Sequence, residues 1–174
     1  MITIVNPSSR PGGRSAVIAS TYKSILDDLE EPSCILNLSD FTPAMIDAIY
    51  YTFAEDKKGF DVLQQTVDKS EKFVFILPEY NGSFPGLLKL FIDACTYPDS
   101  FEHKKAAMVG LSGGTQGAAL AMGHFADILN YFGAHTLALR PRFIRINEAI
   151  ADGRLHNEEY LEFLKIQAEQ IAAF

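Results

Sequence analysis

The sequence lacks the features of several protein classes. It contains only two cysteines, Cys34 and Cys95, and they form no CxxC pair. Cys34 lies in an apolar run and Cys95 on the face of a predicted helix, so we expect two buried thiols in a protein of a reducing compartment. No HExxH motif or other close metal-ligand spacing involves the histidines His103, His124, His135 and His156. No metal site is predicted.

Long apolar runs and basic clusters are also missing. No window reaches the number of apolar residues that a membrane span needs, and the N-terminus has neither the basic region nor the cleavage site of a signal peptide. The formal net charge is −7 and Lys and Arg form no cluster, which disfavours nucleic acid as a partner. We therefore expect a soluble, cytoplasmic protein that binds neither nucleic acid nor membrane.

Strand-like and helix-like patterns alternate along the chain. Strands are predicted at 2–6, 34–38, 72–77, 105–111 and 134–139, and helices at 14–29, 59–70, 86–96, 115–132 and 157–173. Residues 41–51 are ambiguous, although Thr42-Pro43 is typical of a helix start. The length suits one flavodoxin-like domain over residues 1–174 with a sizeable core.

The strand-like runs are almost continuously apolar, as in FVFIL (73–77), which is typical of strands covered on both faces. Alternating strands and helices indicate βαβ units and a parallel sheet. We predict an α/β fold in which a doubly wound, five-stranded parallel sheet of order 2-1-3-4-5 forms a three-layer α/β/α structure. Another three-layer strand order stays the alternative.

Unusual loop sequences follow the first, third and fourth predicted strands. In a sheet of order 2-1-3-4-5 these strands are neighbours, and ligands bind beyond their carboxyl ends where the strand order reverses. We therefore expect the three loops to form one crevice.

The first loop, NPSSRPGGRS (6–15), combines hydroxyl groups, two arginines and two glycines between a strand and a helix start. Hydroxyl groups, guanidinium groups and a helix N-terminus all favour phosphate oxygens. The GK[ST] ending of a Walker A loop is missing. The alternative is a polar turn in which Ser15 caps the helix.

The second loop, PEYNGSFP (78–85), is bounded by two prolines, which restrict its backbone. Gly82 permits a positive φ or the close approach of a flat ligand. Glu79 has no histidine, cysteine or second carboxylate nearby in sequence to complete an acid–base pair. A rigid turn without a ligand is the alternative.

The third loop, GLSGGTQGAA (110–119), is rich in small residues. It fails the GxGxxG template because Ser112 stands in the place of the first glycine, so a dinucleotide site is poorly supported. Small residues here would let a ring system approach the backbone, and tight packing of the strand on the helix is the alternative.

These motifs resemble a known family. The stretch PEYNGSFPGLLKLFID (78–93) is similar to the signature P-E-Y-N-x-S-x-P-x-x-L-K-x-x-I-D of the NADPH-dependent FMN reductase family. That family comprises flavodoxin-like flavoproteins that include azo, quinone and chromate reductases. The resemblance extends to the serine/arginine loop and the glycine loop, and so to nearly the whole chain.

The resemblance implies bound FMN and a set of contact residues. It places the FMN phosphate at Ser8, Arg10 and Ser15, with Ser9 nearby, and the isoalloxazine ring at Pro78, Glu79, Tyr80, Asn81, Gly82 and Ser83. The other side of the crevice would be closed by Ser112, Gly113, Gly114, Gln116 and Gly117. The first loop departs from the usual G-S-x-R-x-x-S, with Pro7 for the glycine and an extra Pro11-Gly12-Gly13. It therefore stays open which of Ser8, Ser9 and Arg14 contacts the phosphate.

The function that the resemblance implies is FMN-dependent NAD(P)H oxidoreduction, in which hydride passes from the co-substrate NAD(P)H through FMN to a small acceptor. No side chain is expected to be catalytic, because a flavin carries the chemistry. The alternative is a flavodoxin-like FMN electron carrier without its own substrate turnover. Three arginines, Arg140, Arg142 and Arg145, cluster after the fifth predicted strand. They would either belong to a surface loop and bind carboxylates or bind the 2′-phosphate of NADPH.

The apolar patterns of two helices bear on assembly. Residues 86–94 and 115–132 are apolar on several faces, which indicates burial on more than one side. A single thick core would explain the pattern equally well. The resemblance favours a homodimer or homotetramer with the flavin edge near the partner subunit.

Overall fold

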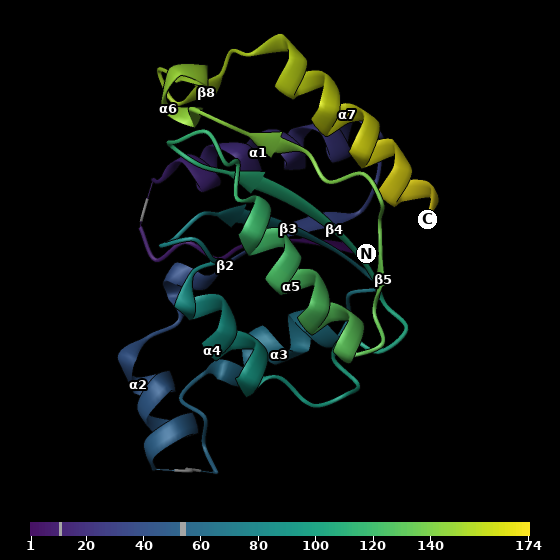
Figure 1. The fold of residues 1–174 in the computed structure, drawn as a ribbon. Helices are drawn as coiled ribbons and strands as arrows, with labels where there is room; N and C mark the ends of the chain where they lie inside the picture. Colours follow the sequence, from purple (N-terminus) through teal and green to yellow (C-terminus); the bar gives the residue numbers. More distant parts are fainter. Residues whose placement is uncertain (11, 53–54) are drawn as a thin grey trace.

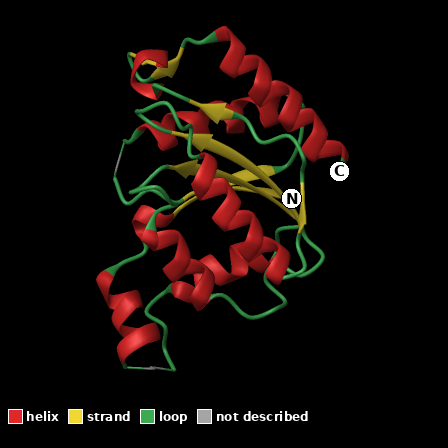
Figure 2. Ribbon diagram, viewed as in Figure 1, coloured by secondary structure: helices red, strands yellow, loops and turns green. Residues whose placement is uncertain are grey.

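The computed structural model describes residues 1–10, 12–52 and 55–174 and contains a parallel sheet between two layers of helices (Figures 1 and 2). The sheet order is β2-β1-β3-β4-β5, and every pair along it is parallel. This confirms the predicted flavodoxin-like order. The strands are β1 (Ile2–Asn6), β2 (Ser33–Asn37), β3 (Lys72–Pro78), β4 (Lys105–Leu111) and β5 (His135–Thr136).

Helices cover both faces of the sheet. One face carries α1 (Arg14–Asp28) and α7 (Glu158–Ala173), and the other carries α3 (Phe60–Asp68), α4 (Gly86–Ala94) and α5 (Ala119–Tyr131) (Figure 1). Helix α7 begins where the Asn157 side-chain oxygen accepts a 2.9 Å hydrogen bond from the Tyr160 N–H. This cap satisfies one of the N–H groups that a helix start leaves unpaired.

The central strands divide their side chains between two hydrophobic cores. On β3, Phe73 and Phe75 face α3, α4 and α5, whereas Val74 and Ile76 face α1 and α7. This alternation follows from the two-residue period of a strand. Both faces are therefore buried, and this explains why the strand sequences are continuously apolar.

The fifth strand differs from its prediction over 134–139. Pairing of β5 with β4 stops after Thr136, and a separate short strand, β6 (Arg142–Phe143), pairs with the other end of β4. Pro141 has no N–H to donate, and its carbonyl accepts from the Gly110 N–H at 2.9 Å. The apolar run at 134–139 predicts one continuous strand, whereas the structure has two short strands, β5 and β6.

Other differences lie at helix starts. The helix predicted over 115–132 begins at Ala119, because Gly117 and Ala118 have φ values of +56° and +59°, outside the right-handed helical region. Ser15 lies inside α1, whose N-cap is Gly13, so the alternative in which Ser15 caps the helix does not hold.

The ambiguous residues 41–51 hold a short helix, α2 (Pro43–Ile46), whose start is capped by the Thr42 hydroxyl. A π-helical turn, η2 (Asp47–Tyr51), follows it, and a 3-10 turn, η1 (Leu38–Asp40), precedes it. After β6, a short helix α6 (Ile146–Ala149) and a hairpin of β7 (Ile150–Ala151) and β8 (Arg154–Leu155) were not predicted. Short elements of this kind carry no clear periodic pattern.

Both cysteines are free thiols, but they differ in burial. Cys95 is buried, and burial raises its pKa to about 12, whereas Cys34 is half-buried. The expectation of two buried thiols therefore holds for Cys95 alone. Within the described residues, no helix combines the length and the apolar content that crossing a bilayer requires.

The glycine loop packs closely on β4, and this contact yields a stability prediction. A Cβ atom on Gly110 would lie 2.4 Å from the Gly117 carbonyl oxygen and 2.9 Å from Met122 Cε. We expect Gly110→Ala to lower the free energy of unfolding by about 1–3 kcal/mol, measured by urea unfolding followed by circular dichroism. Gly123→Ala is the matched control. A Cβ there meets nothing within 4 Å on helix α5, and alanine should stabilise by about 0.5–1 kcal/mol. Equal effects of both changes would contradict the described packing.

Candidate functional site

The predicted loops meet beyond the carboxyl ends of β1, β3 and β4, at the edge of the sheet on the left of Figure 1. They surround a cavity of about 360 Å³, which we call the crevice. It lies at the point where the strand order reverses, the place where doubly wound sheets bind ligands. The residues that line it are Ser8, Arg10, Gly12, Gly13, Arg14, Ser15, Pro78, Glu79, Tyr80, Leu111, Ser112, Gly113, Ile146 and Asn147.

The first and second loops contact each other through Tyr80. Its hydroxyl lies 3.2 Å from the Ser8 hydroxyl, and the Arg10 guanidinium lies over its ring, 4.9 Å from the centroid. The Ser8 hydroxyl also accepts a 3.1 Å hydrogen bond from the Arg10 N–H. Tyr80 therefore orders the side chains that the first loop presents to the crevice.

The second loop is a tight turn from Tyr80 to Ser83. The Tyr80 N–H donates to the Ser83 carbonyl at 2.7 Å, and the Ser83 N–H donates to the Tyr80 carbonyl at 3.0 Å. Asn81 and Gly82, between them, have φ values of +51° and +77°. Positive φ at both central residues is typical of a type I′ turn, which Asn-Gly favours. The turn forms the rim of the crevice.

A carboxylate joins the second loop to the third. The Glu79 Oε2 accepts a 3.2 Å hydrogen bond from the Ala118 N–H, at the N-cap of α5. A negative charge is favourable at a helix N-terminus. Within the third loop, the Ser112 hydroxyl accepts from the Gly117 N–H at 2.9 Å and donates to the Gly114 carbonyl at 3.1 Å.

A fourth segment, residues 143–147, completes the crevice and escaped the sequence analysis. It runs along the glycine loop: Phe143 accepts from the Ser112 N–H at 2.9 Å, and the Ile146 N–H donates to the Ser112 carbonyl at 3.0 Å. Ile146 and Asn147 line the cavity. No local motif marks this segment, because its place depends on backbone pairing with Ser112, which lies far earlier in the chain.

The structure brings together some of the predicted contact residues and leaves others at the margin. The crevice is lined by the predicted Ser8, Arg10, Ser15, Pro78, Glu79, Tyr80, Ser112 and Gly113. Outside this lining lie the predicted Ser9, Asn81, Gly82, Ser83, Gly114, Gln116 and Gly117. Gly117 is buried against Arg142, where a Cβ would lie 2.8 Å from the arginine Cβ.

The marginal residues come from all three loops, and those of the third loop are Gly114, Gln116 and Gly117. Asn81, Gly82 and Ser83 form the rim turn, and Ser83 shares a 3.1 Å hydrogen bond with the ring nitrogen Nδ1 of His124 on α5. Ser9 is exposed in the first loop. Pro11 of the same loop lies outside the described residues. Gly12 and Gly13 line the crevice but were not among the predicted contacts, and Arg14, which the sequence left open as a phosphate contact, lines it too.

The donors at one end of the crevice suit a phosphate group. Two guanidinium groups and two buried hydroxyl groups, those of Ser8 and Ser15, surround the start of α1. The first turn of α1 contains no acidic residue, so the positive end of the helix dipole is available to an anion. At the opposite end, Tyr80 lines the crevice and leads into the rim turn, where the space around the Gly82 Cα is open: a Cβ there would meet nothing within 4 Å. The residues present thus fit FMN.

Comparison with known proteins agrees with this fit. The family model of NADPH-dependent FMN reductase matches residues 1–140. A 2-hydroxy-1,4-benzoquinone reductase of Burkholderia sp. is 26% identical over 70% of this chain and 68% of its own. An NAD(P)H-dependent FMN reductase of Pseudomonas aeruginosa is 30% identical over 62% of this chain and 60% of its own.

A solved structure shares the fold along almost the whole length. The flavoenzyme FerB, an NAD(P)H:(acceptor) oxidoreductase from Paracoccus denitrificans, superposes with a TM-score of 0.81 at 24% identity, covering 99% of this chain and 94% of its own. The family match spans the chain from β1 through nearly all of the β5–β6 connection, and so includes three of the four segments that surround the crevice. The chain belongs to the NADPH-dependent FMN reductase family.

Proposed function

We propose that the crevice holds FMN with its phosphate at the start of α1 and its ring at the rim turn of residues 80–83. The chain is an FMN-dependent NAD(P)H oxidoreductase by family. The observation that carries the proposed placement is the convergence of Arg10, Arg14 and two buried serines on a helix start beside the switch point of the sheet. Bound FMN supplies hydride acceptance from NAD(P)H and reduction of the second substrate.

The side chains of the phosphate end bind and orient. Arginine donates charge-assisted hydrogen bonds in a planar fork that matches phosphate oxygens. Ser15 adds a hydroxyl that is buried within the first turn of α1. Ser8 is hydrogen-bonded to Tyr80, so binding of the phosphate and the position of the tyrosine ring are linked.

The rim turn would present its backbone to the ring. The N–H groups of Tyr80 and Ser83 are used within the turn, which leaves those of Asn81 and Gly82 outside its own hydrogen bonds. Backbone donors held by positive φ values are fixed in direction before a ligand binds. We infer that they donate to the polar edge of the ring, where charge accumulates on reduction.

Acid–base chemistry by a side chain is not part of the proposal. The ionisable groups that line the crevice are Arg10, Arg14, Glu79 and Tyr80. Glu79 already accepts a hydrogen bond from the backbone at the start of α5, and a guanidinium is a hydrogen-bond donor that does not act as a general acid or base. The second substrate is therefore proposed to be a small electron acceptor. It needs a binding space beside the flavin ring and does not need a catalytic side chain. The relatives described above are named as reductases, and this favours a reductase over an electron carrier.

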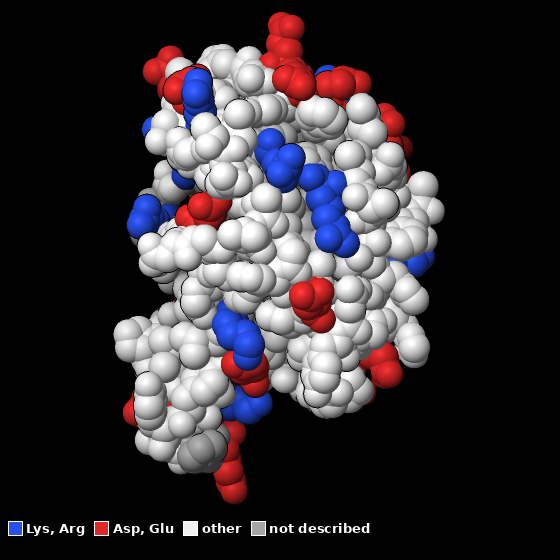
Figure 3. All heavy atoms as spheres, in the orientation of Figure 1, with Lys and Arg blue, Asp and Glu red and all other residues white. Residues whose placement is uncertain are grey.

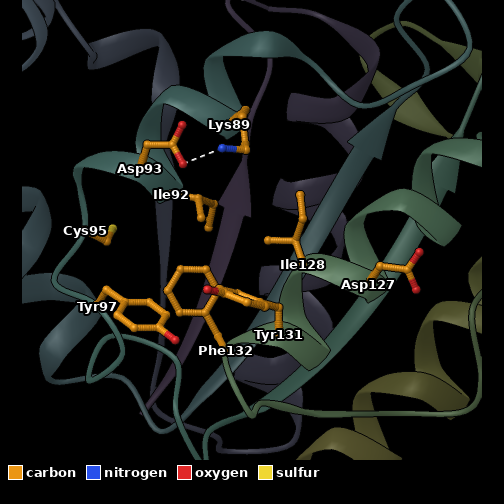
Figure 4. Close-up of a pocket in the computed structure, with 9 residues that line it drawn as sticks. All are labelled: Lys89, Ile92, Asp93, Cys95, Tyr97, Asp127, Ile128, Tyr131 and Phe132. Atoms are coloured by element: carbon orange, nitrogen blue, oxygen red, sulfur yellow. Dashed lines mark hydrogen bonds and ion pairs between the residues drawn. The ribbon is translucent and has the colours of Figure 1, made fainter.

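The cavity between α4 and α5 suggests how the chain assembles. It measures about 470 Å³ and lies away from the crevice, lined by Lys89, Ile92, Asp93, Cys95, Tyr97, Asp127, Ile128, Tyr131 and Phe132 (Figure 4). Tyr97 and Tyr131 stack there with their ring centroids 5.8 Å apart, yet both are more than half exposed. On the face seen in Figure 3, the surface over α4 and α5 is mostly uncharged.

We propose that a second copy of the chain covers this face. Leu120, His124, Asp127 and Tyr131 form one stripe along α5, and Leu120 and Tyr131 are 64% and 74% exposed. Exposed large apolar groups in one stripe are typical of an interaction surface. The charged residues of this face are few: Lys89 pairs with Asp93 on α4, and Asp127 lies on α5 (Figure 4). Because His124 contacts Ser83, this interface would reach the rim of the crevice.

The free thiols support a cytoplasmic location, which we also propose. Cys34 and Cys95 are unbridged, and unbridged cysteines are typical of reducing compartments. We also propose that residues 1–174 form one domain and that this domain carries the whole activity.

The activity has a direct spectroscopic test. The purified protein should be yellow, and its visible flavin absorption should bleach anaerobically on adding NADPH or NADH and return on adding a quinone. A yellow protein that neither nicotinamide bleaches would contradict the reductase. A colourless protein that does not bind added FMN would contradict the proposed cofactor site.

Two substitutions separate a structural Glu79 from a catalytic one. Glu79→Gln retains an oxygen that accepts from the Ala118 N–H, so turnover with NADPH should stay within about threefold of wild type. Glu79→Ala removes the acceptor, and we expect a loss of about 1.5–3 kcal/mol in the free energy of unfolding together with weaker FMN binding. Steady-state kinetics and urea unfolding measure both. A general base would instead show a turnover loss of about 10²-fold or more for Glu79→Gln, and this result would refute the structural role.

The proposed interface predicts a change of mass in solution. Tyr131→Lys should convert the dimer to a monomer at micromolar concentration, because it places two charges in an apolar contact. Sedimentation equilibrium measures this. Val62→Lys, at a similarly exposed apolar residue on α3, is the control and should leave the mass unchanged. A wild-type monomer, or a dimer that survives Tyr131→Lys, would show that α4 and α5 do not form the interface.

A further inference from the structure

We propose that Asn147 is a positioning residue that holds Arg14 over the phosphate end of the crevice, so that Arg14 is the main contact of the FMN phosphate. This inference rests on the proposed function of the crevice. It concerns a pair of residues from opposite ends of the chain. The Arg14 Nε donates a 3.1 Å hydrogen bond to the Asn147 Oδ1, and both residues line the crevice.

The geometry of this bond leaves the guanidinium ready for an anion. Arginine has five N–H donors, and the bond to Asn147 uses the one on Nε. The four donors on the terminal Nη atoms stay available, and they form the flat fork that binds two oxygens of one phosphate. A tether through Nε therefore fixes the direction of the side chain without consuming its phosphate-binding edge.

Asn147 itself is held in place by the glycine loop. The backbone of residues 145 and 146 is paired with the loop through hydrogen bonds from the Arg145 N–H to Gly114 at 2.8 Å and from the Ile146 N–H to Ser112 at 3.0 Å. The Asn147 amide nitrogen lies beside Gly113, where a Cβ atom would come within 3.4 Å of it. The side chain of Asn147 therefore lies near Gly113 of the third loop and accepts its hydrogen bond from Arg14 of the first loop.

The other candidates in the first loop have different partners. Arg10 lies over the Tyr80 ring, and the Ser8 hydroxyl is bonded to Tyr80 and to the Arg10 backbone. Ser9 is exposed and does not line the crevice. Arg14, at the first position of α1, is the cation whose guanidinium is tethered to the opposite wall.

The tether matters because an exposed arginine samples many rotamers when free. A ligand that must order the side chain binds more weakly than one that meets it already ordered. Asn147 lies beyond residue 140, where the match to the family model ends. The C-terminal segment of this chain therefore contributes to a phosphate site that sequence motifs place entirely in the first loop.

The experiment compares the binding of FMN and of riboflavin, which lacks the phosphate, to the apoprotein by quenching of flavin fluorescence. We expect Arg14→Ala to raise the Kd for FMN by about 10–100-fold and Asn147→Ala by about 3–10-fold. Both variants should bind riboflavin within twofold of wild type. The double variant should bind FMN no more weakly than Arg14→Ala, because the two residues act as one unit.

Two further variants sharpen the test. Asn147→Asp keeps an oxygen for Arg14 but places a negative charge near the phosphate, so it should weaken FMN binding more than Asn147→Ala and leave riboflavin unchanged. Asn130→Ala, an exposed asparagine near the end of α5 and outside the crevice lining, should change neither ligand. Circular dichroism confirms that each variant is folded.

The outcomes distinguish the inference from the proposed function. Equal weakening of FMN and riboflavin by Asn147→Ala would mean that Asn147 shapes the crevice and does not act through the phosphate. Independent, additive effects of the two substitutions would also overturn the positioning role. A wild-type protein that binds FMN no better than riboflavin would overturn the phosphate site as a whole. Failure of the wild type to bind either flavin would overturn the proposed function itself.

Discussion

Parallel pairing of β1, β3 and β4 is the constraint on which the site depends. Because the three strands run in the same direction side by side, their carboxyl ends and the loops that follow must meet at one edge. The pairing is stabilised by burial on both faces, with Phe73 and Phe75 in one core and Val74 and Ile76 in the other. A ligand site thus follows from the same arrangement that buries the apolar surface of the sheet.

Single polar contacts then fix the loops to one another. Ser8 with Tyr80 joins the first loop to the second, Glu79 with Ala118 joins the second to the third, and Arg14 with Asn147 links the first loop to the C-terminal segment. In each contact the polar group holds a loop in position, and none of these groups is proposed to transfer a proton. This is consistent with a site in which a cofactor carries the chemistry and the protein supplies orientation.

The accuracy of the sequence predictions varies with the range of the interaction involved. The central strands were predicted well because continuous apolar runs such as FVFIL report burial on both faces directly. The fifth strand was predicted as continuous because its apolar run carries no local mark of the point after Thr136 where pairing with β4 ends. The start of α5 was placed too early because the positive φ of Ala118 has no signature in an alanine.

The sequence by itself determined the family, the order of secondary-structure elements, and the loops that carry hydroxyl groups, arginines and glycines. These are local properties, written in periodicity and in motifs of adjacent residues. Only the tertiary structure decided which of those residues face the crevice, that Glu79 is bound to the start of α5, and that Asn147 stands opposite Arg14. Arg14 and Asn147 are 133 positions apart, and contacts of that range are set by the packing of the sheet, which no local pattern encodes.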